Sequence, residues 1–199
     1  MKINVGVLTS SRTKESDEQY TPFYAVEPLL QYIKPNSTIW CPFDLEWSAY
    51  VTTFEENGFK VIRSHLDDGL NFFEYEPEEH YDLIVSNPPF TKKDQVLERL
   101  KELDKPFALL LPLNSLQGKK RFESMEEIQL LFFNERIGYH NQKQLDTPVE
   151  GSPFASGYFC KDFLPKDLIG LKLNKFKREI VMGKSHKDDR SLKLKQEEL

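Results

Sequence analysis

The fold is decided by the segment Tyr81-Asp82-Leu83-Ile84-Val85-Ser86-Asn87-Pro88-Pro89-Phe90, in which an apolar run leads directly into two prolines and an aromatic residue. The Leu, Ile and Val content of this run is typical of a strand that is buried on both faces of a parallel sheet. Open α/β sheets bind ligands beyond the carboxyl ends of their strands. The tetrapeptide that follows the run therefore lies where a binding site is expected.

The tetrapeptide has the chemistry to hold a planar group that carries an amine. Pro88 and Pro89 fix their φ angles and donate no hydrogen bonds, so the loop is stiff and its carbonyl groups can face a ligand. We expect the Asn87 side-chain oxygen and the Pro88 carbonyl to accept the two N–H bonds of the amine, while Phe90 stacks on the ring. Such acceptors would localise the amine lone pair and direct it at an electrophile. The alternative is a rigid proline turn that only ends a core strand.

Strand-like apolar runs alternate with amphipathic stretches along the chain, which predicts an α/β domain with a mainly parallel sheet. The expected strands are residues 38–41, 60–64, 81–86, 107–112, 128–133 and 155–160. The expected helices are residues 47–57, closed by Gly58, and residues 92–103. A further helix should begin with Thr21 as N-cap and Pro22 in its first turn. Because Pro28 removes a hydrogen bond, residues 22–33 should form a kinked helix or two short ones.

The composition sets limits on the class of protein. A length of 199 residues suits one globular domain that needs no disulfide or metal for stability. The apolar runs are far shorter than the ~20 residues of a transmembrane helix, and no secretory signal is visible, so we expect a cytoplasmic protein without membrane contact. Cys41 and Cys160 are expected to be reduced thiols. The four histidines show no metal-ligand spacing, so no metal is expected.

Asn87-Pro88-Pro89-Phe90 resembles the signature of the class I S-adenosylmethionine-dependent methyltransferases that modify adenine N6. Within that class, the chain resembles the EcoRI-type adenine-specific DNA methyltransferases. The resemblance covers roughly residues 20–164 and includes Tyr20-Thr21-Pro22-Phe23-Tyr24-Ala25, Ile39-Trp40-Cys41-Pro42-Phe43-Asp44, Gly69-Leu70-Asn71-Phe72-Phe73 and Pro153-Phe154-Ala155-Ser156. It implies a Rossmann-like fold with an antiparallel strand near the C-terminal end, S-adenosylmethionine as cofactor, and in-line methyl transfer to a flipped-out adenine, with DNA as the expected partner.

The same resemblance implies which residues bind the cofactor. They lie in four segments: Thr21, Pro22 and Tyr24; Cys41, Pro42, Phe43 and Asp44; Ser64, His65 and Asp67; and Asn71 and Phe72. The first of these segments would contact the methionine end of the cofactor, where a helix N-terminus suits a carboxylate.

Two features of the chain depart from the family. The loop after the first strand has no glycine, so backbone cannot approach a ligand as closely there, and Asp44 or Glu46 is expected to supply its carboxylate. His65 stands where the family has an acidic residue that binds the ribose, with Asp67 and Asp68 just beyond it. Too few residues separate Ser64 from Tyr81 for a helix and a strand, so the third strand of the family should be missing or reduced.

The charge is divided unevenly along the chain. The net charge of −5 combines −9 over residues 1–160 with +4 over residues 161–199. We expect residues 1–170 to form the catalytic domain and residues 171–199 a basic, partly disordered tail. Its candidates for phosphate contacts are Lys172, Lys175, Lys177 and Arg178, although a solvated basic face would look the same. Residues 140–153 are expected to form a long exposed loop.

Other functions remain open at this stage. The same tetrapeptide also serves methyltransferases that modify RNA adenine or the side-chain amide of protein glutamine. A second alternative is a catalytically silent relative that binds nucleic acid or a partner protein, since the loop at residues 41–47 lacks the usual glycines. The sequence leaves the oligomeric state open.

Overall fold

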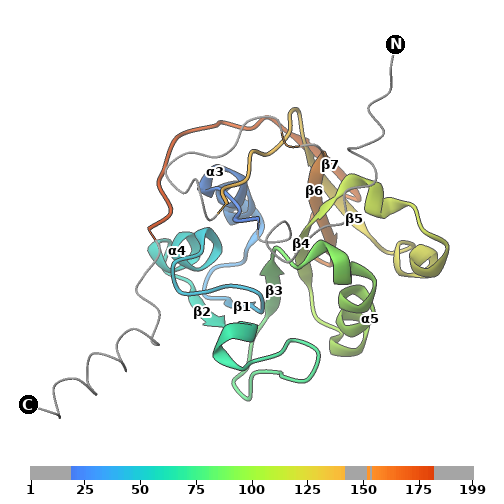
Figure 1. Ribbon diagram of the computed structural model, residues 1–199, viewed down its shortest axis with the longest axis horizontal. Helices are drawn as coiled ribbons and strands as arrows, with labels where there is room; N and C mark the ends of the chain where they lie inside the picture. Colours follow the sequence, from blue (N-terminus) through green and yellow to red (C-terminus); the bar gives the residue numbers. More distant parts are fainter. Residues whose placement is uncertain (1–18, 142–151, 153, 182–199) are drawn as a thin grey trace, which may run out of the picture.

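A computed structural model of the protein describes residues 19–141, 152 and 154–181. Within these residues one mixed sheet runs through the molecule and helices cover it (Figure 1). Its strands are β1 (Thr38–Cys41), β2 (Lys60–Arg63), β3 (Leu83–Ser86), β4 (Phe107–Pro112), β5 (Gln129–Phe133), β6 (Ser156–Lys161) and β7 (Leu168–Leu171). The first six lie within one or two residues of the predicted ranges.

The strand order of the sheet is β2-β1-β3-β4-β6-β5-β7. Neighbouring strands are parallel except at β6, which is antiparallel to both β4 and β5. The chain builds outward from β1 to β2 and then returns past β1 to β3, so a switch point lies between β1 and β3. The predicted Rossmann-like α/β fold and its antiparallel strand near the C-terminal end are both confirmed.

We expected the third strand of the family to be missing or reduced, and the described chain forms no strand between β2 and β3. Strand β2 is one edge of the sheet, and residues 64–82, all of which are described, hold the 3-10 helix η2 (Leu66–Asp68) and turns. Gly69 closes η2 with φ 80°, a left-handed conformation that glycine adopts without strain. The short connection therefore leads directly from β2 to β3.

The helices are α3 (Phe23–Val26), α4 (Ala49–Glu56) and α5 (Lys93–Leu103), with 3-10 helices η1 (Glu27–Tyr32), η3 (Phe90–Lys92), η4 (Leu113–Leu116) and η5 (Lys119–Ser124). The break that Pro28 predicts is present, because α3 ends at Val26 and the chain continues as η1. The prediction that Thr21 is the N-cap is wrong. Pro22 occupies that position with extended backbone, and no side chain caps the helix.

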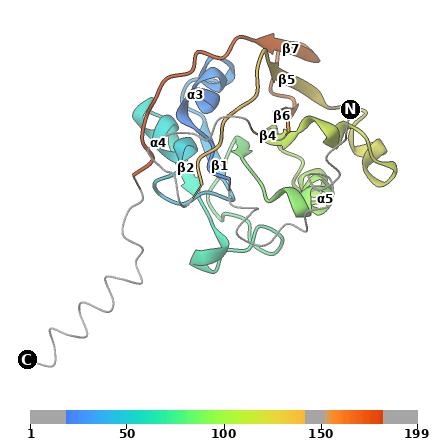
Figure 2. The ribbon, with the colours of Figure 1, turned by 45° about the horizontal axis from the view of Figure 1, so that its top comes forward.

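The helices cover both faces of the sheet. Helix α3 packs against α4 on one face, and α5 lies on the other (Figure 2). Opposite faces follow from right-handed crossovers that lead away from the switch point in opposite directions. Between the layers, the Tyr158 hydroxyl donates to the Ala25 carbonyl at 3.0 Å and lies 3.0 Å from the Tyr50 hydroxyl. These buried groups join β6 to α3 and α4.

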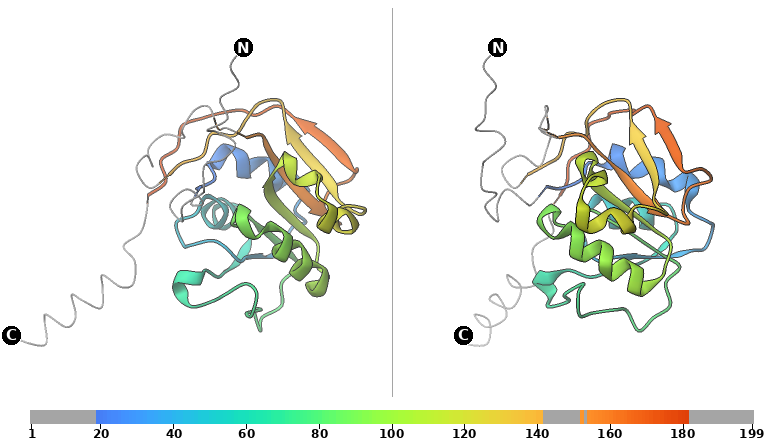
Figure 3. Two further views of the ribbon diagram at one scale, coloured as in Figure 1. Left: turned by 45° about the vertical axis from the view of Figure 1, so that its right-hand side comes forward. Right: turned by 90° about the vertical axis from the view of Figure 1, so that its right-hand side faces the viewer.

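The C-terminal part of the described chain was not predicted. Strand β7 pairs in parallel with β5 and forms the second edge of the sheet (Figure 3). Residues 172–181 then run from β7 past α3 to α4 (Figure 1), and Leu173 and Ile180 are buried against the domain. Residues 182–199 of the predicted basic tail lie outside the described residues, as do residues 142–151 and 153 of the predicted long loop.

Candidate functional site

An open cleft lies beside the switch point of the sheet. Its lining comes from residues 19–21, 43–45 and 47–50, together with His65, Asn87 and Ile180. The cleft therefore gathers the loop after β1, the turn after β2 and the residue after β3.

Asn87 lines this cleft and has an unsatisfied side-chain acceptor. Its Nδ2 donates to the Gln19 carbonyl oxygen at 2.8 Å, and this bond fixes the orientation of the side-chain amide. The Oδ1 atom is buried and has no hydrogen-bond partner among the described residues. A buried acceptor without a partner costs about 1–3 kcal/mol, so an N–H group of a ligand would be stabilising there.

Phe90 is buried more deeply than its predicted stacking role requires. It is 4% exposed, and its ring packs edge to face against Phe154 at 5.4 Å and Tyr139 at 6.4 Å between centroids. A base can reach the Phe90 ring only if one of these aromatic neighbours moves. Pro88 is buried as well, while Pro89 is half-buried.

Asp44 is a buried carboxylate in the lining of the cleft. It is 6% exposed, and the Ser86 hydroxyl donates to its Oδ2 at 2.5 Å. Burial raises the pKa of Asp44 to about 6, against the opposing effect of hydrogen bonds from Ser86 and Ser48. Glu46, the other candidate for the carboxylate of this loop, is exposed and does not line the cleft. Between these two alternatives, the geometry favours Asp44, which joins the loop after β1 to the end of β3.

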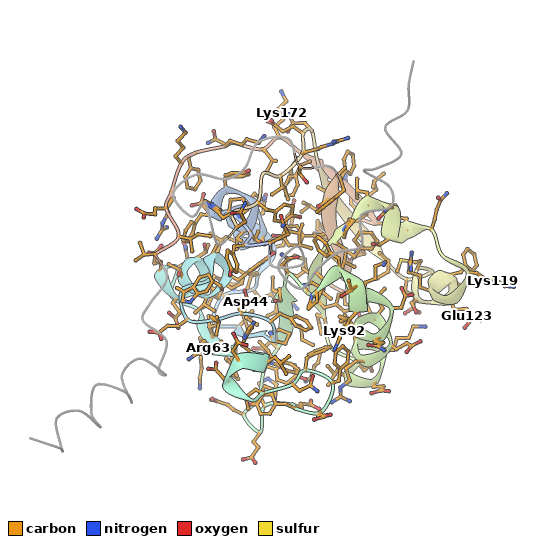
Figure 4. All side chains as sticks on the ribbon, in the orientation of Figure 1. Asp44, Arg63, Lys92, Lys119, Glu123 and Lys172 are labelled. Carbon is orange, nitrogen blue, oxygen red and sulfur yellow. The ribbon has the colours of Figure 1, made fainter. Side chains whose placement is uncertain are left out.

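The end of β2 contributes His65 to the cleft. The His65 Nδ1 accepts a hydrogen bond from the Asp67 amide at 3.1 Å, as the cap of η2. The Asp67 side chain is mostly exposed, and Asp68 pairs with Arg63 at 2.7 Å. Figure 4 shows Arg63 close to Asp44 in projection, at the same end of the sheet. His65 is therefore the residue of this turn that a bound ligand would contact.

Four of the twelve predicted cofactor residues line the cleft: Thr21, Phe43, Asp44 and His65. The other eight lie outside the lining: Pro22, Tyr24, Cys41, Pro42, Ser64, Asp67, Asn71 and Phe72. Six of these eight are buried and support the site through packing and hydrogen bonds. The Ser64 hydroxyl accepts from the Trp40 indole at 3.0 Å, for example, and Phe72 packs on Phe43 with centroids 4.8 Å apart. The Tyr24 hydroxyl donates to the Gly138 carbonyl at 3.2 Å.

Several lining residues were missed by the sequence analysis. The rings of Tyr20 and Trp47 meet edge to face at 5.0 Å. Ser48 caps α4 by accepting from the Val51 amide at 3.2 Å, and the first turn of α4 lines the cleft. A serine before an apolar helix is a recognisable N-cap signal, so Ser48 could have been found. Ile180 carries no such local signal.

Two of the four basic residues predicted to contact phosphate are engaged within the protein. Arg178 donates to both carboxylate oxygens of Glu56 at 2.6 and 3.0 Å, and Lys175 pairs with Glu135 at 2.7 Å. Lys177 is exposed. Lys172 is exposed too, and Figure 4 shows it at the top of the molecule, well away from Asp44. The structure does not bring the four residues together at the cleft.

Among the described residues, no group of three or more His, Cys, Asp or Glu side chains could hold a metal ion. No helix in the described part of the chain is long and apolar enough to cross a membrane. Cys41 and Cys160 are unpaired, as predicted, and both are buried.

No protein-family model matches the chain, and no curated protein is significantly similar to it in sequence. Among solved structures, it resembles a Listeria monocytogenes protein provisionally described as a class I S-adenosylmethionine-dependent methyltransferase. The TM-score is 0.46 at 12% identity, over 86% of this chain and 70% of that one. A Thermoplasma acidophilum protein provisionally described as a methyltransferase gives a TM-score of 0.35 at 10% identity, over 70% and 73% of the two chains. Neither likeness bears on the substrate.

Proposed function

We propose that the protein is an S-adenosylmethionine-dependent methyltransferase that acts on the N6 amine of adenine, with DNA as the acceptor. The observation that carries this proposal is that Asn87, whose buried Oδ1 has no hydrogen-bond partner among the described residues, lines a cleft at the sheet switch point. The amide is already held by Gln19, so its acceptor is oriented before any ligand arrives. S-adenosylmethionine, when bound, supplies a methyl group on a positively charged sulfur.

The residues of the cleft fit this cofactor. Tyr20, Phe43, Trp47 and His65 would surround its adenosine with aromatic surface. Asp44 would place a carboxylate near its positive charges, which stabilises the ionised form of that buried side chain. The first turn of α4 would favour its carboxylate, because helix N-termini attract anions. Helix α4 thus takes the role that we expected of the helix after Thr21.

The acceptor chemistry belongs to the segment after β3. The Asn87 Oδ1 and the Pro88 carbonyl would accept the two N–H bonds of the amine and point its lone pair at the methyl group. Because Asn87 directly follows Ser86, the hydrogen bond from Ser86 to Asp44 holds the acceptor segment against the cofactor loop. The adenine must leave the duplex to reach this loop, at a cost of a few kcal/mol. Stacking on Phe90 would return about 1–3 kcal/mol once Phe154 or Tyr139 has moved.

Two readings of the same site compete with this proposal. RNA adenine and glutamine side chains present similar N–H pairs, so Asn87 could orient any of these acceptors. The second alternative is a catalytically silent relative, and the glycine-free loop after β1 is the feature that favours it. It would keep the cleft without binding the cofactor.

The proposal is tested in two steps. Calorimetric titration should show that the wild-type protein binds S-adenosylmethionine, whereas no heat at millimolar cofactor would favour the silent relative. Radiolabelled methyl transfer is then measured separately on DNA, RNA and protein. Incorporation into DNA at adenine supports the proposal. Incorporation only into RNA or protein retains the cofactor site and replaces the acceptor.

A further inference from the structure

We propose that residues 173–181, called the strap, form one wall of the cofactor cleft, and that Arg178 sets the affinity for the cofactor by holding the strap in place. This inference rests on the proposed function, because it names further residues of the same binding site. No sequence motif points to the strap, since it lies outside the span of the family resemblance.

Ile180 is the residue of the strap that reaches the cleft. It lines the cleft together with Thr21 and Asp44, and it is 1% exposed. The next residue, Val181, is 71% exposed, so the chain turns one apolar side chain inward and leaves its neighbour in solvent. Ile180 is therefore placed to remove solvent from one side of a ligand in the cleft.

Arg178 anchors the strap two residues before Ile180. Its guanidinium donates two hydrogen bonds to the carboxylate of Glu56, the last residue of α4. The same guanidinium lies 4.0 Å from the centroid of the Phe23 ring. Arg178 also lowers the pKa of the Glu56 carboxyl, mainly through its hydrogen bonds. A planar cation that makes a bidentate pair and also contacts an aromatic ring fixes position in a way that lysine cannot.

Further contacts hold the rest of the strap against α3 and against the residues that follow β5. The Phe176 ring meets Tyr24 edge to face with centroids 6.4 Å apart, and Lys175 pairs with Glu135 at 2.7 Å. Tyr24 and Phe23 belong to the helix that begins two residues after Thr21, which lines the cleft. The basic residues that looked like phosphate contacts in the sequence thus include two anchors of the strap.

The strap could instead only stabilise the fold, and the two roles predict different measurements. If the strap is a wall of the cofactor site, substitutions in it change the dissociation constant and the KM for S-adenosylmethionine. If the strap is purely structural, the same substitutions lower the melting temperature and leave both constants unchanged. Cofactor affinity therefore has to be measured at a temperature where every variant is folded, as checked by circular dichroism.

The experiment compares single variants of the full chain by calorimetric titration with S-adenosylmethionine. Ile180→Ala should weaken binding about tenfold, the effect of losing a modest apolar contact. Arg178→Ala should raise the dissociation constant and the KM by a similar factor and leave kcat unchanged. Lys177→Ala is the matched control, because Lys177 is an exposed cation on the same strap, and this variant should bind as the wild type does.

The anchor is tested by a double-mutant cycle. If Arg178 acts through Glu56, the double variant Arg178→Ala/Glu56→Ala should bind no more weakly than Arg178→Ala alone. Unchanged cofactor affinity in both Ile180→Ala and Arg178→Ala would overturn the inference and leave the proposed function intact. An absence of cofactor binding by the wild-type protein would overturn both.

Discussion

Replacing Asp44 with asparagine should make the protein more stable at neutral pH. The wild-type side chain is buried, and its pKa is raised to about 6 from 3.8, mainly by burial. Asparagine resembles the protonated acid and keeps an oxygen that can accept the hydrogen bond from Ser86. The substitution therefore removes a buried charge without leaving the Ser86 hydroxyl unpartnered.

The size of this gain in stability and the pH range over which it develops follow from the raised pKa of Asp44. Between about pH 4 and pH 6 the folded protein holds a proton on Asp44 that the unfolded chain has released, so wild-type stability falls as the pH rises through this window. The rise of the Asp44 pKa from 3.8 to about 6 corresponds to roughly 3 kcal/mol. Asp44→Asn should gain up to that amount relative to the wild type at pH 7.5 and show little difference at pH 4.

Urea unfolding at several pH values measures this effect. The difference between the free energies of unfolding of the two proteins isolates Asp44, because the other carboxyl groups titrate in both. Under the proposed function, the stable variant should also bind S-adenosylmethionine more weakly at pH 7.5, since it lacks the negative charge in the cleft. A difference that stays constant from pH 4 to pH 7.5, or a variant less stable than the wild type at neutral pH, would refute the reasoning.

Two further substitutions test the packing around the site. Tyr158→Phe should lower the free energy of unfolding by about 1–3 kcal/mol, because it leaves the buried Ala25 carbonyl without its donor, and urea unfolding would show this. Gly157→Ala should destabilise by about 1–3 kcal/mol, since the added Cβ would lie 2.8 Å from the backbone oxygen of Leu131. Gly58→Ala is its matched control: no atom lies within 4 Å of the added Cβ, and only the cost of its positive φ, about 1–2 kcal/mol, should appear in thermal unfolding.

The central part of the fold could be predicted because its signals are local. The apolar run that becomes β3 is buried at every position, and Pro28 divides the first helix where its missing N–H requires. The short distance between Ser64 and Tyr81 excluded a strand by length alone. Helix α4 begins later than predicted, at Ala49, because Ser48 caps it, and Trp47 stays outside the helix to line the cleft.

Other features depend on residues far apart in the chain. Strand β7 has only four residues, alternately exposed and half-buried, and depends on pairing with β5. The pairing of Arg178 with Glu56 spans 122 positions. Nothing in the sequence around either residue distinguishes it from an ordinary charged residue on the surface. Packing by Phe154 and Tyr139, which buries Phe90, likewise leaves no periodic pattern near Asn87.

The central claim is that Asn87 orients the amine of adenine for methyl transfer. The most direct test is the N6-methyladenine content of DNA from a host without adenine methylation of its own, expressing either the wild type or Asn87→Ala. We predict N6-methyladenine with the wild type and none with Asn87→Ala, while the purified variant binds S-adenosylmethionine as the wild type does. Equal N6-methyladenine in the two hosts, or none in either while the cofactor binds, would contradict the account.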